Sequence, residues 1–220
     1  MNVEIDTDRG TVGGVWTRPS GVSAALVVGH GAGNDMESPL LVGFSDGLAE
    51  RGVGSLRFNF PFKHQGRRAP DPPAVLRQSF TAAFEEAARR AKDAPVFAGG
   101  KSLGGRIASL LVADGLPAAG LVFVGYPLHA PGKPGRPRDE HLERIEVPML
   151  FLQGTRDSLA RWDLVEALTR RLGDRATLHP VEGGDHSFRV RGVRTPADQI
   201  GRALADPAAD FIVRAQSSAR

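Results

Sequence analysis

The chain has no cysteine among its 220 residues, which excludes disulfides, thiolate metal sites and a cysteine nucleophile. Its 28 lysines and arginines nearly balance 25 acidic residues, and no long basic run is present, so we expect no nucleic-acid partner. No apolar run approaches the roughly 20 residues that cross a bilayer. The N-terminus also lacks the basic and apolar segments of a secretory signal. We therefore predict a cytoplasmic protein that binds no membrane.

The length and composition predict one globular domain that spans residues 1–220. Strand-type apolar runs, such as 24–29 and 148–153, alternate with segments of helical periodicity, such as 74–93 and 159–172. This alternation predicts an α/β fold with a mostly parallel sheet that is covered by helices on both faces. No segment is long enough to form a large cap domain, and we find no internal repeat.

A glycine-flanked serine follows one of the predicted strands. The segment Gly100-Lys101-Ser102-Leu103-Gly104 fits the G-x-S-x-G pattern, which resembles the nucleophile elbow of α/β-hydrolases. Glycines are needed in such an elbow because a sharp turn from strand to helix presses backbone against backbone. The turn exposes the serine hydroxyl at a helix N-terminus, where free N–H groups can meet developing negative charge. The pattern predicts Ser102 as a nucleophile.

The same residues also resemble the end of a phosphate-binding P-loop, G-x-x-x-x-G-K-[ST]. The first glycine of that motif would fall at Pro95. Proline has no N–H to offer a phosphate, and the residues that follow it favour a strand over an anion-binding loop. The nucleophile elbow is therefore the favoured interpretation.

A serine nucleophile needs a base and an acid that orients the base. After Ser102, Asp157 follows a predicted strand, and His186 lies in a glycine-rich loop after the last strand. Their order and their positions at strand ends predict Asp157 as the acid and His186 as the base. The competing acids are Asp163, inside a helix, Asp174, at the other edge of the sheet, and Asp185, which is adjacent to the histidine.

An oxyanion hole requires two backbone N–H groups. We expect one from Leu103, directly after the nucleophile, and the other from the loop His30-Gly31-Ala32-Gly33. Ala32 is the first choice for the second donor and Gly33 is the alternative. We expect His30 to hold this loop without taking part in the chemistry.

Several further segments carry a resemblance over nearly the whole chain. They are 30–33, 57–62, 66–71, 99–106, 153–157 and 184–187. On these segments the chain resembles compact α/β-hydrolases of the dienelactone-hydrolase-like group. More narrowly, it is similar to the family of small α/β-hydrolases that includes testis-expressed protein 30 and the hydrolase domain of KAT8 regulatory NSL complex subunit 3. The resemblance implies a triad of Ser102, Asp157 and His186, with no cofactor and no metal, and leaves the substrate open. The chain departs from dienelactone hydrolases in one respect, because their nucleophile is a cysteine.

The substrate class is less strongly indicated. Lys63, Arg67 and Arg68, in a segment over 60–73 that we expect to be an ordered loop, could meet a carboxylate or phosphate together with Lys101. The alternative is that these cations are solvated surface. We predict an esterase-like serine hydrolase that acts on a small acyl substrate. The alternatives are a non-catalytic interaction module on the same fold and, less favoured, a lyase or acyltransferase.

Overall fold

The computed structural model describes residues 1–218 of the chain, and for Ser218 the backbone only. Its strands are β1 (Asn2–Thr7), β2 (Gly10–Thr17), β3 (Ala24–Gly29), β4 (Val53–Phe58), β5 (Val96–Lys101), β6 (Leu121–Val124), β7 (Met149–Gly154) and β8 (Ala176–Val181). Its α-helices are α1 (Pro39–Glu50), α2 (Pro61–His64), α3 (Pro73–Ala91), α4 (Leu103–Ala113), α5 (Trp162–Leu172) and α6 (Ala197–Ser218). Two short 3₁₀ helices, η1 (Glu140–Arg144) and η2 (Gly173–Arg175), complete the described elements.

All eight strands belong to one sheet, in the order β1-β2-β4-β3-β5-β6-β7-β8. The strands from β4 to β8 are parallel, while β1 and β2 form an antiparallel hairpin that pairs with β4. The central strands β3, β4, β5, β6 and β7 are buried along their whole length. Such continuous burial requires helices on both faces, as the uniformly apolar runs in the sequence predicted.

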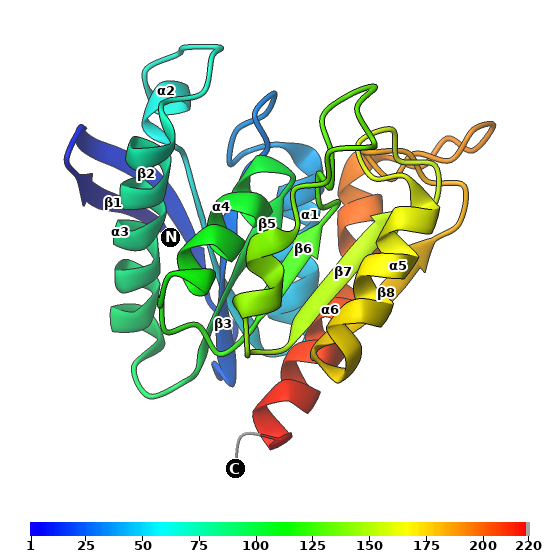
Figure 1. Cartoon of the computed structure of the whole chain (residues 1–220). Coiled ribbons are helices and arrows are strands. Elements are labelled where there is room, and N and C mark those ends of the chain that lie inside the picture. Colours follow the sequence, from blue (N-terminus) through cyan, green and yellow to red (C-terminus); the bar gives the residue numbers. More distant parts are fainter. Residues whose placement is uncertain (219–220) are drawn as a thin grey trace.

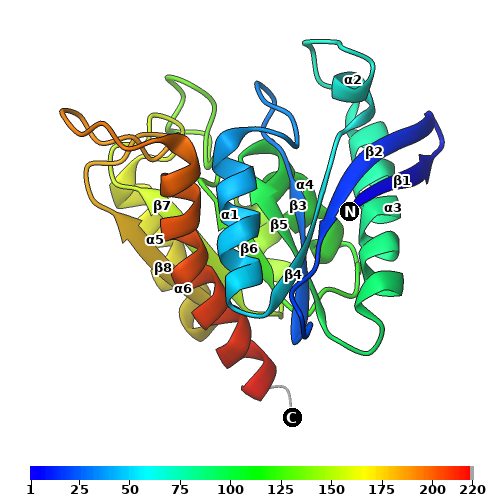
Figure 2. The ribbon, with the colours of Figure 1, turned by 180° about the vertical axis from the view of Figure 1, so that it is seen from behind.

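Helices α3, α4 and α5 cover one face of the sheet (Figure 1), and α1 and α6 cover the other (Figure 2). The core is correspondingly divided in two. Phe58, Phe80 and Phe123 lie in the larger cluster beneath α3 and α4, and Phe44 and Phe211 lie in the cluster beneath α1 and α6. None of the helices within residues 1–218 is long and apolar enough to cross a lipid bilayer. The predicted single-domain α/β architecture is confirmed.

The chain reverses its direction of travel through the sheet between β3 and β5. From β3 it moves to β4 on one side, and from β5 it moves to β6 on the other. The loop after β3 leads to α1 on one face, while the turn after β5 leads directly to α4 on the opposite face. A crevice opens at the carboxyl ends of strands at such a switch point. The fold therefore brings the loop 30–33 and Ser102 to the same place.

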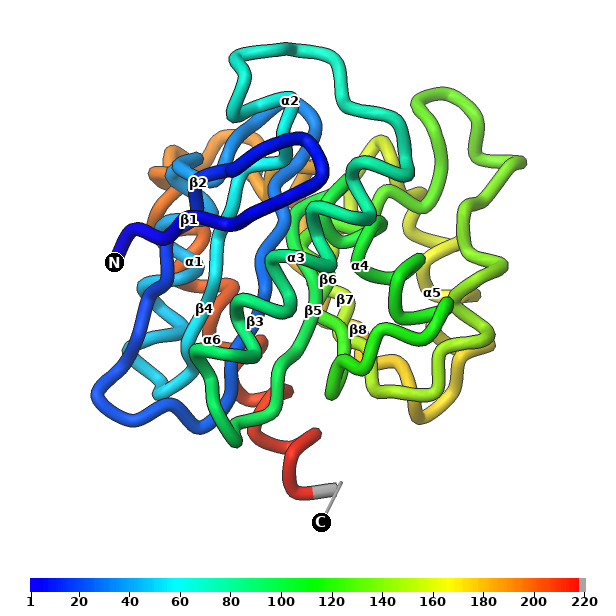
Figure 3. Tube along the Cα trace, turned by 90° about the vertical axis from the view of Figure 1, so that its left-hand side faces the viewer, coloured from blue at the N-terminus to red at the C-terminus, as the bar shows by residue number. Residues whose placement is uncertain are grey.

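The segment 60–73 contains a structured turn where we expected only loop. Pro61 begins α2, a single helical turn in which the N–H groups of Lys63 and His64 both donate to the carbonyl of Phe60. One turn is too short to leave a periodic apolar pattern, although proline is favoured at the first helical position. Figure 3 shows this segment at the top of the molecule, with the last turns of α6 at the opposite end.

Candidate active site

The turn between β5 and α4 holds Ser102 in a conformation that side chains rarely adopt. Its φ and ψ angles are 49° and −108°, outside the regions favoured by L-residues. A strained residue of this kind persists only where the surrounding structure forces it, and such residues concentrate at functional sites. The N–H of Ser102 donates to the carbonyl of Val124 on the neighbouring strand, at 3.3 Å, which fixes the base of the turn.

The structure brings Ser102, His186 and Asp157 into one hydrogen-bonded line. His186 Nε2 lies 3.0 Å from Ser102 Oγ, and His186 Nδ1 lies 2.7 Å from Asp157 Oδ2. The Asp157 side chain is fully buried, whereas 24% of the His186 side chain is exposed. A buried carboxylate at Nδ1 favours the tautomer that leaves Nε2 free to accept the serine proton. This is the geometry of an activated hydroxyl.

The competing aspartates are occupied elsewhere or exposed. Asp163 pairs with Arg161 on the surface, at 2.7 Å. Asp185 Oδ1 accepts hydrogen bonds from the N–H groups of Ser187 and Arg189, at 2.7 and 2.9 Å, and so caps the turn that carries the histidine. Asp174 is exposed in η2. Of these aspartates, Asp157 alone makes a side-chain contact with His186 in the described part of the chain.

Gln153 is a functional candidate to which the sequence analysis gave no role. This fully buried side chain donates from Nε2 to Asp157 Oδ2, at 2.6 Å, and accepts at Oε1 from the N–H of Tyr126, at 2.9 Å. The other carboxylate oxygen, Oδ1, accepts from the N–H of Leu159, at 2.7 Å. These donors fix the orientation of the Asp157 carboxylate. The signal available in the sequence was a glutamine within an apolar strand, four residues before Asp157.

His30 fixes the loop after β3 from within the core. Its Nε2 accepts from the N–H of Phe60, at 3.1 Å, so Nδ1 must carry the proton that reaches the carbonyl of Gly31, at 2.8 Å. Burial lowers the pKa of His30 to about 4, so the ring is neutral at pH 7. Its own carbonyl accepts from the N–H of Gly104 in the first turn of α4, at 3.1 Å. These contacts match the supporting role predicted for His30.

The two segments predicted to supply the oxyanion hole both approach Ser102. Leu103 is the first residue of α4, so its N–H has no acceptor within the helix. A Cβ atom built on Gly31 would lie 3.7 Å from Cβ of Ser102, which shows how closely the loop approaches the nucleophile. Ala32 and Gly33 follow directly and are exposed. The assignment of the second donor to Ala32, with Gly33 as the alternative, stays a prediction.

A second serine–histidine contact lies beneath α4. Ser109 Oγ lies 2.8 Å from His141 Nε2, but the hydroxyl also lies 2.8 Å from the carbonyl of Arg106, which only the hydroxyl proton can bond. Ser109 Oγ therefore accepts a hydrogen bond from the Nε2–H of His141 and donates none to the imidazole. Its side chain is fully buried. This pair is structural, and Ser102 is the serine with the geometry of a nucleophile.

The basic residues predicted near the substrate differ in their surroundings. Arg67 is bound within its own loop, to Gln65 Oε1 at 2.9 Å and Asp71 Oδ1 at 2.5 Å. Lys63 Nζ lies 5.8 Å from the centroid of the Phe62 ring. Arg68 is exposed. Their contact with a substrate stays a prediction.

Lys101 lies in the interior, where only 6% of it is exposed. Its Nζ has no hydrogen-bond partner among residues 1–218 and lies 5.8 Å from the centroid of the Phe188 ring, beneath the loop that carries His186. The chain accommodates this side chain at Gly125, where a Cβ atom would lie only 3.1 Å from Nζ. Burial lowers the pKa of the Lys101 ammonium to about 8, although the charges of Asp157 and Asp185 oppose the change. Lys101 is therefore a buried amine beside Ser102, and it is not one of the exposed cations on the surface around the site.

We expect Lys101→Met to raise stability at pH 7. Lowering the pKa from 10.5 to about 8 corresponds to about 3 kcal/mol at neutral pH. The unfolded chain binds more protons between these two values, so wild-type stability should rise as the pH increases from 8 to 10.5. At pH 7 the variant should be about 2–3 kcal/mol more stable than the wild type. Its stability should not rise between pH 8 and 10.5, because it has no amine to deprotonate at this position. Urea denaturation from pH 7 to 10.5 tests this, with the exposed Lys133→Met as the control. Identical pH profiles for wild type and Lys101→Met would contradict the prediction.

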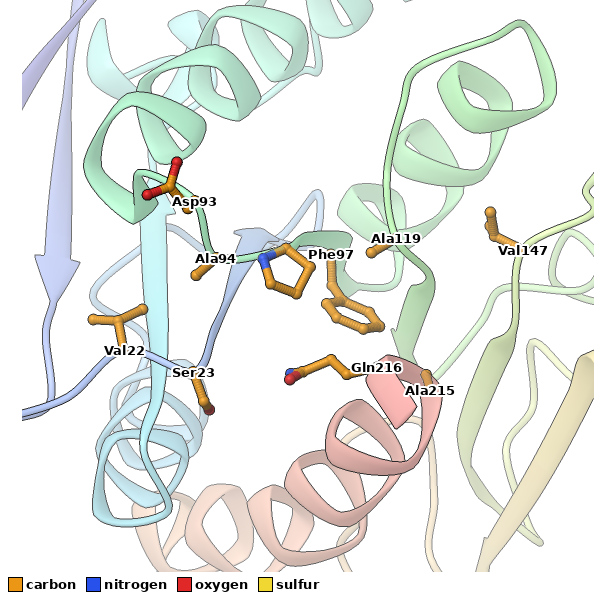
Figure 4. A pocket seen from close by; sticks show the side chains of 10 residues that line it. Val22, Ser23, Asp93, Ala94, Phe97, Ala119, Val147, Ala215 and Gln216 are labelled. Atoms are coloured by element: carbon orange, nitrogen blue, oxygen red, sulfur yellow. The ribbon is translucent and has the colours of Figure 1, made fainter. Parts of the chain in front are cut away.

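A hollow of about 610 Å³ lies at the other edge of the sheet (Figure 4). It is formed where β3 and β5 begin, and Phe97 and Gln216 point into it. Ser102 follows the carboxyl end of β5, so this hollow is separated from it by the length of the strand. The hollow has no part in the chemistry of the serine.

Comparison with known proteins agrees with this fold. Residues 22–212 match the family described as alpha/beta hydrolase domain, and the chain belongs to this family. Three similar solved structures cover nearly the whole chain. A dienelactone hydrolase from Anabaena variabilis is 17% identical, with a TM-score of 0.74 over 97% of this chain and 96% of that one. An α/β serine hydrolase without a lid from Xanthomonas campestris is 19% identical, with a TM-score of 0.75 over 96% and 94%. An α/β serine hydrolase homologue from Coxiella burnetii is 18% identical, with a TM-score of 0.73 over 97% and 96%. The predicted assignment to the α/β-hydrolases is confirmed, and the family supports a hydrolase. The narrower resemblance to dienelactone hydrolases is matched at the level of the fold.

Proposed function

We propose that this chain is a serine hydrolase that cleaves a small carboxylic ester or related acyl substrate through an acyl-enzyme intermediate. The observation that carries the proposal is the position of His186, within hydrogen-bond distance of both Ser102 Oγ and Asp157 Oδ2. In this arrangement a weak nucleophile, a base and an orienting acid lie in contact. The strained backbone of Ser102 and the buried, multiply hydrogen-bonded Asp157 add support.

In the first half of the reaction, Ser102 Oγ attacks the carbonyl carbon while its proton passes to His186 Nε2. The carbonyl oxygen becomes an oxyanion, which the N–H groups of Leu103 and Ala32 stabilise. The tetrahedral intermediate collapses when the imidazolium gives its proton to the departing alkoxide. The products of this half are a free alcohol and an acyl group bound to Ser102.

The second half repeats these steps with water. His186 accepts a proton from a water molecule as its oxygen attacks the acyl carbon, and a second oxyanion forms in the same hole. The imidazolium then returns the proton to Ser102 Oγ, and the carboxylic acid leaves. Asp157 remains ionised throughout and stabilises the imidazolium. We also propose a cytoplasmic location for this chain.

Labelling with a fluorophosphonate probe tests the activated serine. The wild type should react covalently, Ser102→Ala should not react, and His186→Ala should react at least about 100-fold more slowly because general-base assistance is lost. The measurement is the labelling rate at pH 7.5, with circular dichroism to verify that each variant is folded. A panel of short-chain esters would follow.

Ser187→Ala provides the matched control, since Ser187 is an exposed serine adjacent to His186 and should label like the wild type. A folded wild-type protein that fails to label, or a Ser102→Ala variant that labels normally, would overturn the proposal. The first of these results would favour the non-catalytic interaction module that the sequence left open.

A further inference from the structure

A hollow of about 290 Å³ lies between the two loops that carry the acid and the base of the triad. Its arginines are Arg156, which directly precedes Asp157, and Arg189 and Arg191, which follow His186. All three are exposed. The hollow is distinct from the crevice at Ser102, because its lining comes only from the segments 156 and 183–191.

These three guanidinium groups are not directly paired with a carboxylate among the described residues. Within residues 1–218 none of them makes a side-chain hydrogen bond or ion pair. Arginines elsewhere on the surface commonly have a carboxylate partner, as Arg77 has Asp114 at 2.7 Å. Three like charges around one hollow repel one another, so an anion placed among them would relieve an unfavourable interaction.

The only acid in the hollow is Asp185, and its carboxylate is partly engaged. Oδ1 accepts from the N–H groups of Ser187 and Arg189, at 2.7 and 2.9 Å. One negative charge against three positive ones leaves the hollow with a net charge of about +2. That balance suits a dianion better than a monoanion.

The walls of the hollow are fixed by backbone contacts. The N–H of Arg156 donates to the carbonyl of Gly184, at 2.9 Å, and the N–H of Gly183 donates to Thr155 Oγ1, at 2.8 Å. Gly184 and Val190 form an antiparallel bridge. Phe188, buried at 2% exposure, anchors the turn between them. A scaffold held in this way reduces the ordering cost of binding.

We propose that Arg156, Arg189 and Arg191 form a binding site for the phosphate group of a small molecule. Guanidinium groups bind phosphate through paired, charge-assisted hydrogen bonds. An anion held by Arg156 on one side and by Arg189 and Arg191 on the other would link the loop of Asp157 to the loop of His186. The site requires no chemistry at Ser102, so it stands apart from the proposed hydrolase activity.

Thermal unfolding and calorimetric titration with inorganic phosphate test the site, at pH 7.5 and constant ionic strength set with sodium chloride. Phosphate should raise the melting temperature of the wild type and of Ser102→Ala equally. In Arg156→Gln and Arg189→Gln the Kd for phosphate should increase about tenfold or more, because each variant loses a charge-assisted contact. The control is Arg170→Gln, an exposed arginine in the last turn of α5, which should bind like the wild type.

Phenyl phosphate, added as a second probe, distinguishes the source of the phosphate group. Equal Kd values would indicate free phosphate, and a Kd at least about tenfold lower for phenyl phosphate would indicate an organic phosphate ester; both support the site. The proposal fails if neither probe shifts the wild-type melting temperature beyond the chloride control. It also fails if the double variant Arg156→Gln/Arg189→Gln keeps the wild-type Kd.

Discussion

Replacing Asp157 with asparagine should reduce kcat for ester hydrolysis by about 10³- to 10⁴-fold while leaving KM within a few-fold of the wild type. The reason lies in the partners of the carboxylate. Oδ2 accepts from both His186 Nδ1 and Gln153 Nε2, and Oδ1 accepts from the N–H of Leu159. Every position around this side chain therefore requires an acceptor.

An asparagine cannot satisfy these three donors in either orientation. With its NH₂ group at the Oδ2 position, it would face the amide of Gln153 and favour the histidine tautomer whose Nε2 carries the proton. With the NH₂ group at the Oδ1 position, it would face the N–H of Leu159. Either arrangement places a donor against a donor in a fully buried site, and the imidazolium also loses its counter-charge.

Steady-state kinetics on an ester that the wild type hydrolyses, together with fluorophosphonate labelling rates, measure this effect. Asp163→Asn is the matched control, because Asp163 is one of the competing acids and pairs with Arg161 on the surface. Its kcat should remain within about twofold of the wild type, as surface ion pairs contribute little. A folded Asp157→Asn variant with near-wild-type kcat would show that another group orients His186.

The contact of Ser102, His186 and Asp157 was predictable because its sequence signals are local. Ser102 lies among glycines that a sharp turn from strand to helix requires. Asp157 and His186 each follow a strand, and the carboxyl ends of parallel strands lie at the same edge of the sheet. The chain order of strands then determined which loops could meet. The α/β architecture was predictable from the uniformly apolar runs of the buried central strands.

The surroundings of the site were less predictable, because they depend on side-chain direction. Lys101 is adjacent to Ser102 in sequence, yet its amine turns inward because Gly125 leaves space for it. Gln153 acquires its role only when β7 places it beside both Tyr126 and Asp157. Neither contact follows from periodicity or spacing, since each joins atoms from different loops at the end of the sheet.

A substitution at Gly104, in the elbow itself, should cause a large loss of stability. A Cβ atom built on Gly104 would lie 2.2 Å from the carbonyl oxygen and 2.6 Å from Cα of Gly29. Backbone atoms at the end of a central, fully buried strand cannot move aside as a flexible side chain can. Gly104→Ala would therefore push the start of α4 away from β3 and break the bond from the N–H of Gly104 to the carbonyl of His30.

We expect Gly104→Ala to lower the free energy of unfolding by about 4 kcal/mol or more, a size reserved for a few mechanisms such as forced overpacking. The measurement is the urea midpoint, or the absence of a cooperative transition where the variant no longer folds. Gly21→Ala is the control, since nothing lies within 4 Å of a Cβ atom at that position. It should change stability by no more than about 0.5 kcal/mol. A Gly104→Ala midpoint equal to that of Gly21→Ala would mean that α4 can withdraw from β3 at little cost. The contact between loop 30–33 and Ser102 would then be adjustable and not imposed by the packing of the sheet.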